Sequence, residues 1–324
     1  MKLEICAELS ASHLGDFRRA MQIVDAAADA GADLFKVQVW SPGTMCLDMA
    51  YKLTSGPWKG RTLFDLYEEA WTPWAWLPDL FARVRKRGMI PFGAAFDRES
   101  VDYLESLHVD RHKIASFELT DIPLIRYMAS KGKPMILSTG MATLDEMAAA
   151  YRAAMFNVEG LNDITLLRCT SAYPADPADA NLRVPPNDKW GLSDHSMGIG
   201  VSVAAAALGA TYIEKHLTLS RKDGGPDAGF SMEPAEFKQL VTECRNAAAA
   251  VGTVRYGPGP NESTELRRSL YVYKDTAKGE KLILNGNVRT ARPAKGLSPG
   301  ADISSAYAAR GLLSGEPLTS DCIA

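Results

Sequence analysis

The sequence predicts a (β/α)8 TIM barrel followed by a small, mostly β domain. Up to about residue 251, short apolar runs alternate with segments of helical periodicity, and these form eight strand-then-helix units. A stretch rich in Gly and Pro then leads into short alternating runs separated by turns. We therefore expect a catalytic barrel at 1–252, a linker at 253–267 and a small β domain at 268–324.

Composition limits the classes of partner. The chain has 324 residues and a formal net charge of −3, which does not favour nucleic acid or a membrane surface as a partner. Its five cysteines are scattered without paired spacing, as is typical of reduced thiols in a cytoplasmic protein. The N-terminus does not resemble a signal peptide, and no apolar run is long enough to span a membrane.

In the first half of the barrel, strands are expected at 1–8, 33–39, 89–93 and 111–118, with helices at 17–30, 74–88 and 97–107. Lys36 and Gln38 alternate onto one strand face, where they could either serve a site inside the barrel or lie outward in solvent. The connection at 40–72 is unusually long and rich in tryptophan. It is either a lid that contacts a sugar or a subdomain that packs its own aromatic side chains.

In the second half, strands are expected at 134–137, 163–169, 190–194 and 211–215, with helices at 144–156, 198–209 and 234–251. Lys113, Ser116 and Glu118 stand around one strand end, and Ser138 ends the next strand. A lysine with hydroxyls at strand ends can hold a phosphate, although Ser and Thr there also cap helices. No glycine-rich nucleotide motif is present.

Two histidines close the last two barrel strands. His195 and His216 each follow a strand-like run, so both are expected at the carboxyl-terminal face of the barrel, where barrel enzymes hold their active sites. They could be a metal-binding pair, with Asp194 and Glu214 as their hydrogen-bond partners, or two structural histidines.

Several motifs together resemble those of the sialic acid synthase family, which condenses phosphoenolpyruvate with amino sugars. They are A-E-L-S-A-S-H-L-G (7–15), K-V-Q (36–38), K-I-A-S-F-E (113–118), S-T-G-M (138–141), G-L-S-D-H (191–195) and I-E-K-H (213–216). The resemblance covers essentially the whole chain in order. Within the family, its pseudaminic acid synthase branch is most similar, through G-P-W-K-G-R-T-L-F-D-L-Y, C-T-S-A-Y-P and D-A-G-F-S-M-E-P.

The resemblance implies a reaction and a set of site residues. The reaction is the condensation of phosphoenolpyruvate with 2,4-diacetamido-2,4,6-trideoxy-altrose, which gives pseudaminic acid and phosphate. The implied phosphoenolpyruvate contacts are Lys36, Lys113, Ser116, Ser138 and Ser193. The implied sugar contacts are Gln38, Tyr173, Asp227 and Arg292. The implied catalytic residues are Glu8, Glu118 and His216, and the implied ligands of a divalent metal, Mn²⁺ or Mg²⁺, are His195 and His216.

The resemblance also makes 268–324 an antifreeze-like (SAF) domain whose Arg292 reaches the sugar site of a neighbouring subunit, in a domain-swapped homodimer. One departure is G-A-A-F-D at the end of the third strand, where Ala94 and Ala95 replace the usual hydroxyl residue and proline. Three alternatives remain: an N-acetylneuraminate or legionaminic acid synthase, a Schiff-base aldolase that uses Lys113 or Lys36, and a non-catalytic sugar-binding homologue.

Overall fold

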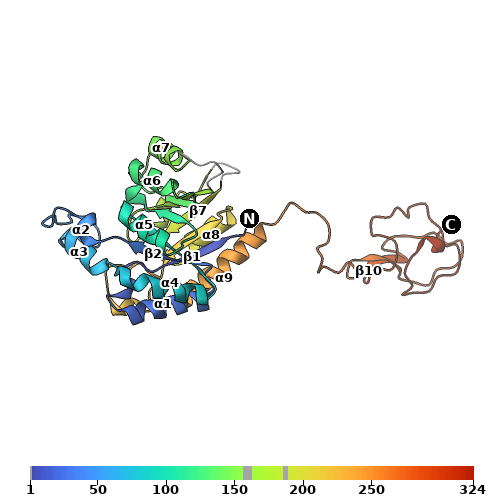
Figure 1. The fold of residues 1–324 in the computed structure, drawn as a ribbon. Coiled ribbons are helices and arrows are strands. Elements are labelled where there is room, and N and C mark those ends of the chain that lie inside the picture. The colour runs from blue at the N-terminus through green and yellow to red at the C-terminus, as the bar shows by residue number, and fades with distance from the viewer. Residues whose placement is uncertain (1, 156–162, 185–188) are drawn as a thin grey trace. The chain divides into compact units, whose positions relative to one another are not determined.

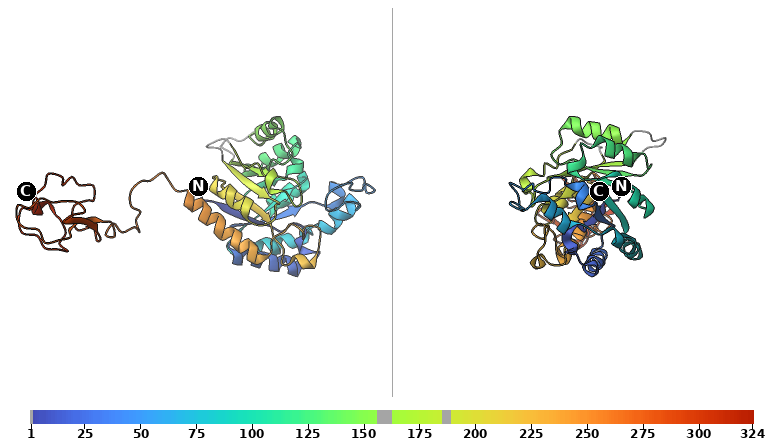
Figure 2. Two further views of the ribbon diagram at one scale, coloured as in Figure 1. Left: turned by 180° about the vertical axis from the view of Figure 1, so that it is seen from behind. Right: turned by 60° about the vertical axis from the view of Figure 1, so that its left-hand side comes forward.

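Eight parallel strands close into a barrel in sequence order in the computed structural model, which describes residues 2–155, 163–184 and 189–324. The strands are β1 (Glu4–Glu8), β2 (Leu34–Val39), β3 (Ile90–Ala95), β4 (His112–Ile114), β5 (Met135–Ser138), β6 (Ile164–Cys169), β7 (Trp190–Asp194) and β8 (Tyr212–His216). The predicted barrel is confirmed, and Figures 1 and 2 show its helices outside the strands. Met1 and the predicted helix end at Phe156 lie outside the described residues.

The barrel strands are buried on both faces, as parallel strands covered by helices must be. Their register positions the site. Glu8 at the end of β1 pairs with Lys36 of β2 on one side and with His216 of β8 on the other. Three of the candidate site residues therefore stand at the same level on adjacent strands.

The helices that cover the barrel are α1 (Phe17–Ala30), α4 (Leu77–Lys86), α5 (Arg98–Ser106), α6 (Ile122–Ala129), α7 (Leu144–Ala154), α8 (Gly200–Ala207) and α9 (Pro234–Val251). In α1, the side chain of Asp16 accepts a hydrogen bond from the Arg18 amide, and Gly31 ends the helix with a positive φ of 89°. The predicted bounds of α1 and α9 are confirmed.

The prediction of a helix after every strand is wrong at one place. Between β6 and β7, the described residues contain only a 3-10 turn at Pro177–Asp179 and no α-helix. The sequence Y-P-A-D-P explains the difference, because each proline lacks an amide hydrogen and restricts the residue before it.

The long connection after β2 contains α2 (Pro42–Met45) and α3 (Leu63–Ala70). Between these helices the chain turns back on itself, with a β-bridge between Lys52 and Thr62 and a hydrogen bond from the Gly60 amide to the Leu53 carbonyl. We call residues 51–63 the hairpin. Figure 1 shows α2 and α3 at the opposite end of the barrel from the N-terminus.

The chain divides into two compact units, Met1–Gly252 and Thr253–Ala324. The second unit has its own apolar core, which includes Leu270, Val288 and Leu318. Its regular strands are only β9 (Ser269–Val272) and β10 (Val288–Ala291), which pair antiparallel, and isolated bridges join the rest. Among the described residues, no helix has the length and apolarity needed to cross a membrane.

Candidate active site

A cavity of about 420 Å³ opens among the carboxyl ends of the barrel strands. It brings together most of the predicted site residues, which are Lys36, Gln38, Lys113, Ser116, Glu118, Ser138, Tyr173, Ser193, His195, His216 and Asp227. Glu8 lies fully buried beside Lys36 and does not line the cavity. Arg292 is exposed in the second unit, and it has no hydrogen bond or ion pair with the other residues of that unit.

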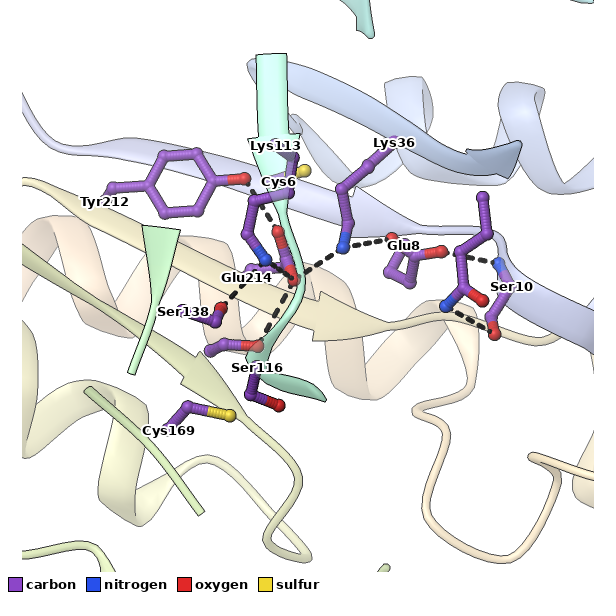
Figure 3. Close-up of polar contacts among 12 residues, drawn as sticks. Cys6, Glu8, Ser10, Lys36, Lys113, Ser116, Ser138, Cys169, Tyr212 and Glu214 are labelled. Carbon is purple, nitrogen blue, oxygen red and sulfur yellow. Dashed lines mark hydrogen bonds and ion pairs between the residues drawn. The ribbon is translucent and has the colours of Figure 1, made fainter. Parts of the chain in front are cut away.

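Two lysines and two carboxylates form the polar floor of the cavity. The Nζ atom of Lys36 lies 2.8 Å from Oε2 of Glu8 and 2.7 Å from Oε1 of Glu214. The Nζ atom of Lys113 lies 3.4 Å from the same Glu214 oxygen. Figure 3 shows Glu214 between the two lysines, so its carboxylate is the centre of the floor. The four side chains are almost completely buried, and their formal charges cancel.

Hydroxyl groups extend this floor toward the cavity. Lys113 donates a hydrogen bond of 2.8 Å to Oγ of Ser138, and Ser193 donates one of 3.2 Å to Glu214. The Oγ atoms of Ser116 and Ser171 lie 2.8 Å apart. The lysine ammonium groups and serine hydroxyls are donors suited to an anion with several oxygens.

Burial and pairing act against each other on these groups. Burial alone would raise the pKa of Glu214, but Lys113 and Lys36 outweigh it and hold that pKa well below its ordinary value. Burial would likewise lower the pKa of Lys36, yet Glu214 and Glu8 raise it. Burial keeps the pKa of Glu8 above its ordinary value despite Lys36. The lysine and carboxylate charges on the floor therefore depend on one another.

The imidazole rings of the two histidines lie next to each other in the lining of the cavity, with ring centroids 5.4 Å apart. The Nδ1 atom of His195 lies 2.9 Å from the carbonyl oxygen of Thr170, so Nδ1 donates its proton and Nε2 keeps a lone pair. The Nδ1 atom of His216 is buried without a hydrogen-bond partner. Burial and the neighbouring His195 lower the pKa of His216 well below its ordinary value, so its imidazole is neutral.

Burial would lower the pKa of His195, but Cys169 and the hydrogen bond to Thr170 outweigh it and raise that pKa. Imidazole nitrogens fit the donor chemistry of a divalent metal, and Nδ1 of His216 is free to act as such a donor. Asp227 stands nearby, with Oδ2 at 3.7 Å from Nδ1 of His216. The described residues contain no cluster of three or more His, Cys, Asp or Glu side chains arranged to hold a metal. The protein would therefore supply part of a ligand set, and oxygens of water or substrate would complete it.

The expected hydrogen bonds from Asp194 and Glu214 to the histidines are wrong. Side chains alternate along a strand, so Glu214 shares the interior face with His216, where it reaches the lysines instead. Asp194 points to the other face and pairs with Lys215 at 2.7 Å. Glu214 stands two residues before His216, so the alternation along the strand could have identified it as part of the floor.

Glu118 lines the cavity away from the ion pairs. Its Oε2 atom is buried without a hydrogen-bond partner, and burial raises its pKa to about 7. A carboxyl group with that pKa can take up and release a proton near neutral pH, as a general acid or base requires.

Two tryptophans of the long connection, Trp40 and Trp58, line the cavity. Trp74 stacks on Tyr103, and Trp76 packs against His13, so these half-buried rings pack against the barrel core instead. Sequence reasoning did not single out Phe230, whose ring lies 5.0 Å from both Tyr173 and His216. Its only signal was its place in the D-A-G-F-S-M-E-P motif.

Ala94, where the third strand departs from the expected motif, is buried and does not line the cavity. The neighbouring Phe96 does line it. Ala94 therefore contributes no side chain to the cavity, and the apolar ring of Phe96 forms part of its wall near this strand end.

Comparison with known proteins identifies the family. A model of the NeuB family matches residues 23–256. A pseudaminic acid synthase from Campylobacter jejuni is 37% identical over 92% of this chain and 89% of its own length. An N,N'-diacetyllegionaminic acid synthase from the same species is 35% identical and covers 92% of each chain. The crystal structure of an N-acetylneuraminic acid synthetase from Leptospira borgpetersenii has a TM-score of 0.72 at 30% identity, over 81% of this chain and 89% of the other. The chain is therefore an enzyme of the NeuB family.

Proposed function

We propose that this enzyme condenses phosphoenolpyruvate with 2,4-diacetamido-2,4,6-trideoxy-altrose to give pseudaminic acid and inorganic phosphate. The observation that carries the proposal is the cavity itself, where a floor with two buried lysines and several serine hydroxyls lies beside a pair of histidines. Relatives that are 37% identical over most of the chain and are named pseudaminic acid synthase support the choice of sugar.

The floor binds phosphoenolpyruvate in this proposal. The ammonium groups of Lys36 and Lys113 donate hydrogen bonds to its phosphate and carboxylate, and Ser116, Ser138 and Ser193 donate further ones. Fixing the anion by several donors presents its methylene carbon in one direction, which reduces the entropy cost of the reaction with the sugar.

The sugar enters on the histidine side as its open-chain aldehyde. Gln38, Tyr173 and Asp227 line this part of the cavity and orient the sugar by hydrogen bonds. His195 and His216 would hold Mn²⁺ or Mg²⁺, and such a cation supplies Lewis-acid polarisation of the aldehyde carbonyl.

The reaction balances with water as the third reactant. The methylene carbon of phosphoenolpyruvate bonds to the aldehyde carbon, and the aldehyde oxygen takes up a proton. Water adds to the cationic carbon at position 2 and loses a proton. The carbon–oxygen bond to phosphate then breaks, the new hydroxyl becomes the ketone, and the leaving phosphate takes up its proton. Glu118 and Glu8 are the candidates to move these protons, because burial raises the pKa of both groups.

Phosphate release from phosphoenolpyruvate, measured with a panel of amino sugars, tests the proposal. The panel contains the 6-deoxy diacetamido altrose, the sugar precursor of legionaminic acid and N-acetylmannosamine, each with and without a chelator. The altrose derivative should react fastest and only without excess chelator. Faster release with another sugar would reassign the substrate. No release with any sugar, together with a borohydride-trapped pyruvate adduct, would point to an aldolase.

Glu118 should make the stability of the enzyme depend on pH, and the substitution Glu118→Gln should remove this contribution. The native state keeps the carboxyl proton up to about pH 7, whereas the unfolded chain loses it near the ordinary pKa of 4.5. Stability contributed by this group therefore falls as the pH rises from about 4.5 through 7. In urea unfolding, Glu118→Gln should be more stable than wild type at pH 8, by a margin that shrinks toward pH 5.

A matched control for this variant is Glu99→Gln, a change of the same kind at an exposed position on α5. It should leave the pH dependence of stability unchanged. In a plot of the reaction rate against pH, the same Glu118→Gln variant should lack the change in rate that wild type shows near pH 7. An unchanged profile in both measurements would show that Glu118 does not titrate near neutrality.

The enzyme should work as a domain-swapped dimer in which Arg292 serves the neighbouring subunit. Arg292 is exposed and lacks a partner among the other residues of its unit, and a linker rich in Gly and Pro precedes its unit. Mixing His216→Ala with Arg292→Ala and allowing subunits to exchange should restore part of the activity, since a mixed dimer then contains one intact site. No recovery after proven exchange would rule out the swap.

A further inference from the structure

The segment after β2 contributes only uncharged, largely apolar side chains to the cavity. Eight cavity-lining residues come from it, namely Trp40, Met45, Leu53, Trp58, Leu63, Leu66, Tyr67 and Ala70. The positively charged side chains of the hairpin do not line the cavity. Lys52 and Lys59 are exposed, and Arg61 forms an ion pair with Glu69. The cavity therefore has two unlike sides among its described residues, a charged floor and an apolar wall.

Trp58 connects this wall to the loop that follows β8. The indole Nε1 donates a hydrogen bond of 2.9 Å to the carbonyl oxygen of Pro226, and the indole ring lies 5.5 Å from the ring of Tyr173. The two hydrogen-bonded residues are 168 positions apart in the sequence. The side chain is half-buried, so one part packs on the protein while the rest faces the cavity.

The loop that Trp58 holds carries two residues directed at His216. Asp227 accepts a hydrogen bond of 3.2 Å from the Ala11 amide and approaches Nδ1 of His216. Phe230 packs its ring against the His216 imidazole. A hydrogen bond to Pro226, the residue directly before Asp227, restricts where both side chains can lie. Trp58 can therefore influence the histidine side without touching the histidines.

We propose that Trp58 is a specificity-determining and positioning residue for the sugar. Its ring forms the contact for an apolar end of the substrate, and its Nε1–H closes the wall against the loop after β8. This inference rests on the proposed condensation with an amino sugar. A methyl group at the end of the sugar suits an aromatic surface, whereas a hydroxyl there loses its water without gaining a partner. Rejection of a hydroxyl by such a wall is modest, about 100-fold at most.

Two substitutions separate the roles of Trp58. Trp58→Phe keeps an aromatic surface and loses the hydrogen bond to Pro226, while Trp58→Ala loses both. The two probe sugars are 2,4-diacetamido-2,4,6-trideoxy-altrose and its 6-hydroxy analogue, 2,4-diacetamido-2,4-dideoxy-altrose. Lys59→Ala is the matched control, because Lys59 is the next residue of the same hairpin, is exposed and does not line the cavity.

Trp58→Ala should raise KM for the deoxy sugar by about 10-fold or more and reduce the preference over the 6-hydroxy analogue. KM for phosphoenolpyruvate should stay within about 2-fold of wild type, because the floor does not touch Trp58. Trp58→Phe should keep the preference but lower kcat, and Lys59→Ala should behave as wild type. Thermal unfolding confirms that each variant is folded.

Several results would overturn the inference. One is an unchanged preference between the two sugars in Trp58→Ala, and another is an equal rise of both KM values. The affinity for the deoxy sugar can be measured by calorimetry without phosphoenolpyruvate. This measurement needs no turnover, so it tests the role of Trp58 separately from the proposed reaction. Suppose that Trp58→Ala binds the sugar more weakly than wild type, but wild type releases no phosphate. The role of Trp58 in sugar binding would then be supported, and the proposed condensation would be refuted. Failure of wild type to bind the sugar would overturn both.

Discussion

Lys113→Ala should raise KM for phosphoenolpyruvate by about 10-fold to 100-fold, with a much smaller change in KM for the sugar. The ammonium group is almost completely buried and donates to Ser138 at the cavity floor. A hydrogen bond to a charged group is typically worth about 1.5–3 kcal/mol, which corresponds to that range of affinity. Initial rates measured across phosphoenolpyruvate concentrations at saturating sugar, and the reverse, give the two KM values.

Among the described residues, the variant leaves Lys36 as the one cationic partner of Glu214, so thermal unfolding should be measured alongside the kinetics. Lys86→Ala, at an exposed position on α4, is the control for the loss of a lysine charge. It should leave both KM values unchanged. If Lys113→Ala folds and keeps the wild-type dependence on phosphoenolpyruvate, Lys113 does not bind this substrate.

His216→Ala should abolish most of the activity and weaken the binding of Mn²⁺ together. Removal of a residue that merely supports a metal ligand costs about 10-fold to 100-fold in affinity or activity, and the loss of one of two protein ligands should cost at least as much. Electron paramagnetic resonance of free Mn²⁺ measures the binding directly, and phosphate release measures the rate.

His108→Asn is a suitable control for a histidine substitution. His108 is exposed and has a positive φ of 55°, a conformation that asparagine tolerates. It should keep both the Mn²⁺ affinity and the rate of wild type. Full activity of wild type in excess chelator, or unchanged Mn²⁺ binding by His216→Ala, would refute the role of the histidines as metal ligands.

The sequence predicts the features that depend on local pattern. The bounds of α1 and α9 follow from apolar periodicity, Gly31 and Pro234. Alternation along β2 predicts that Lys36 and Gln38 share a face, and both line the cavity. The carboxyl ends of β7 and β8 carry the two histidines to one place, as the barrel requires.

Features that depend on packing between distant segments are not predictable in this way. The hydrogen bond from Trp58 to Pro226 joins two loops whose approach no periodicity encodes. The tryptophans at 74 and 76 follow Trp58 closely in the sequence, yet Trp74 stacks on Tyr103 and Trp76 packs against His13 instead of lining the cavity. The role of Glu214 also depends on what the neighbouring strands place opposite it, which are Lys36 and Lys113.

The balance of charge on the cavity floor has a consequence for how the enzyme takes up its anionic substrate. Lys36 and Lys113 are already neutralised by Glu8 and Glu214, so the floor has no spare positive charge to offer. A phosphoenolpyruvate anion therefore makes the cavity strongly negative unless other charge arrives with it. The carboxyl groups of Glu118 and Asp227 already have pKa values raised by burial, and an added anion would raise them further. Binding is then linked to proton uptake, so the affinity for phosphoenolpyruvate should fall as the solution becomes more alkaline.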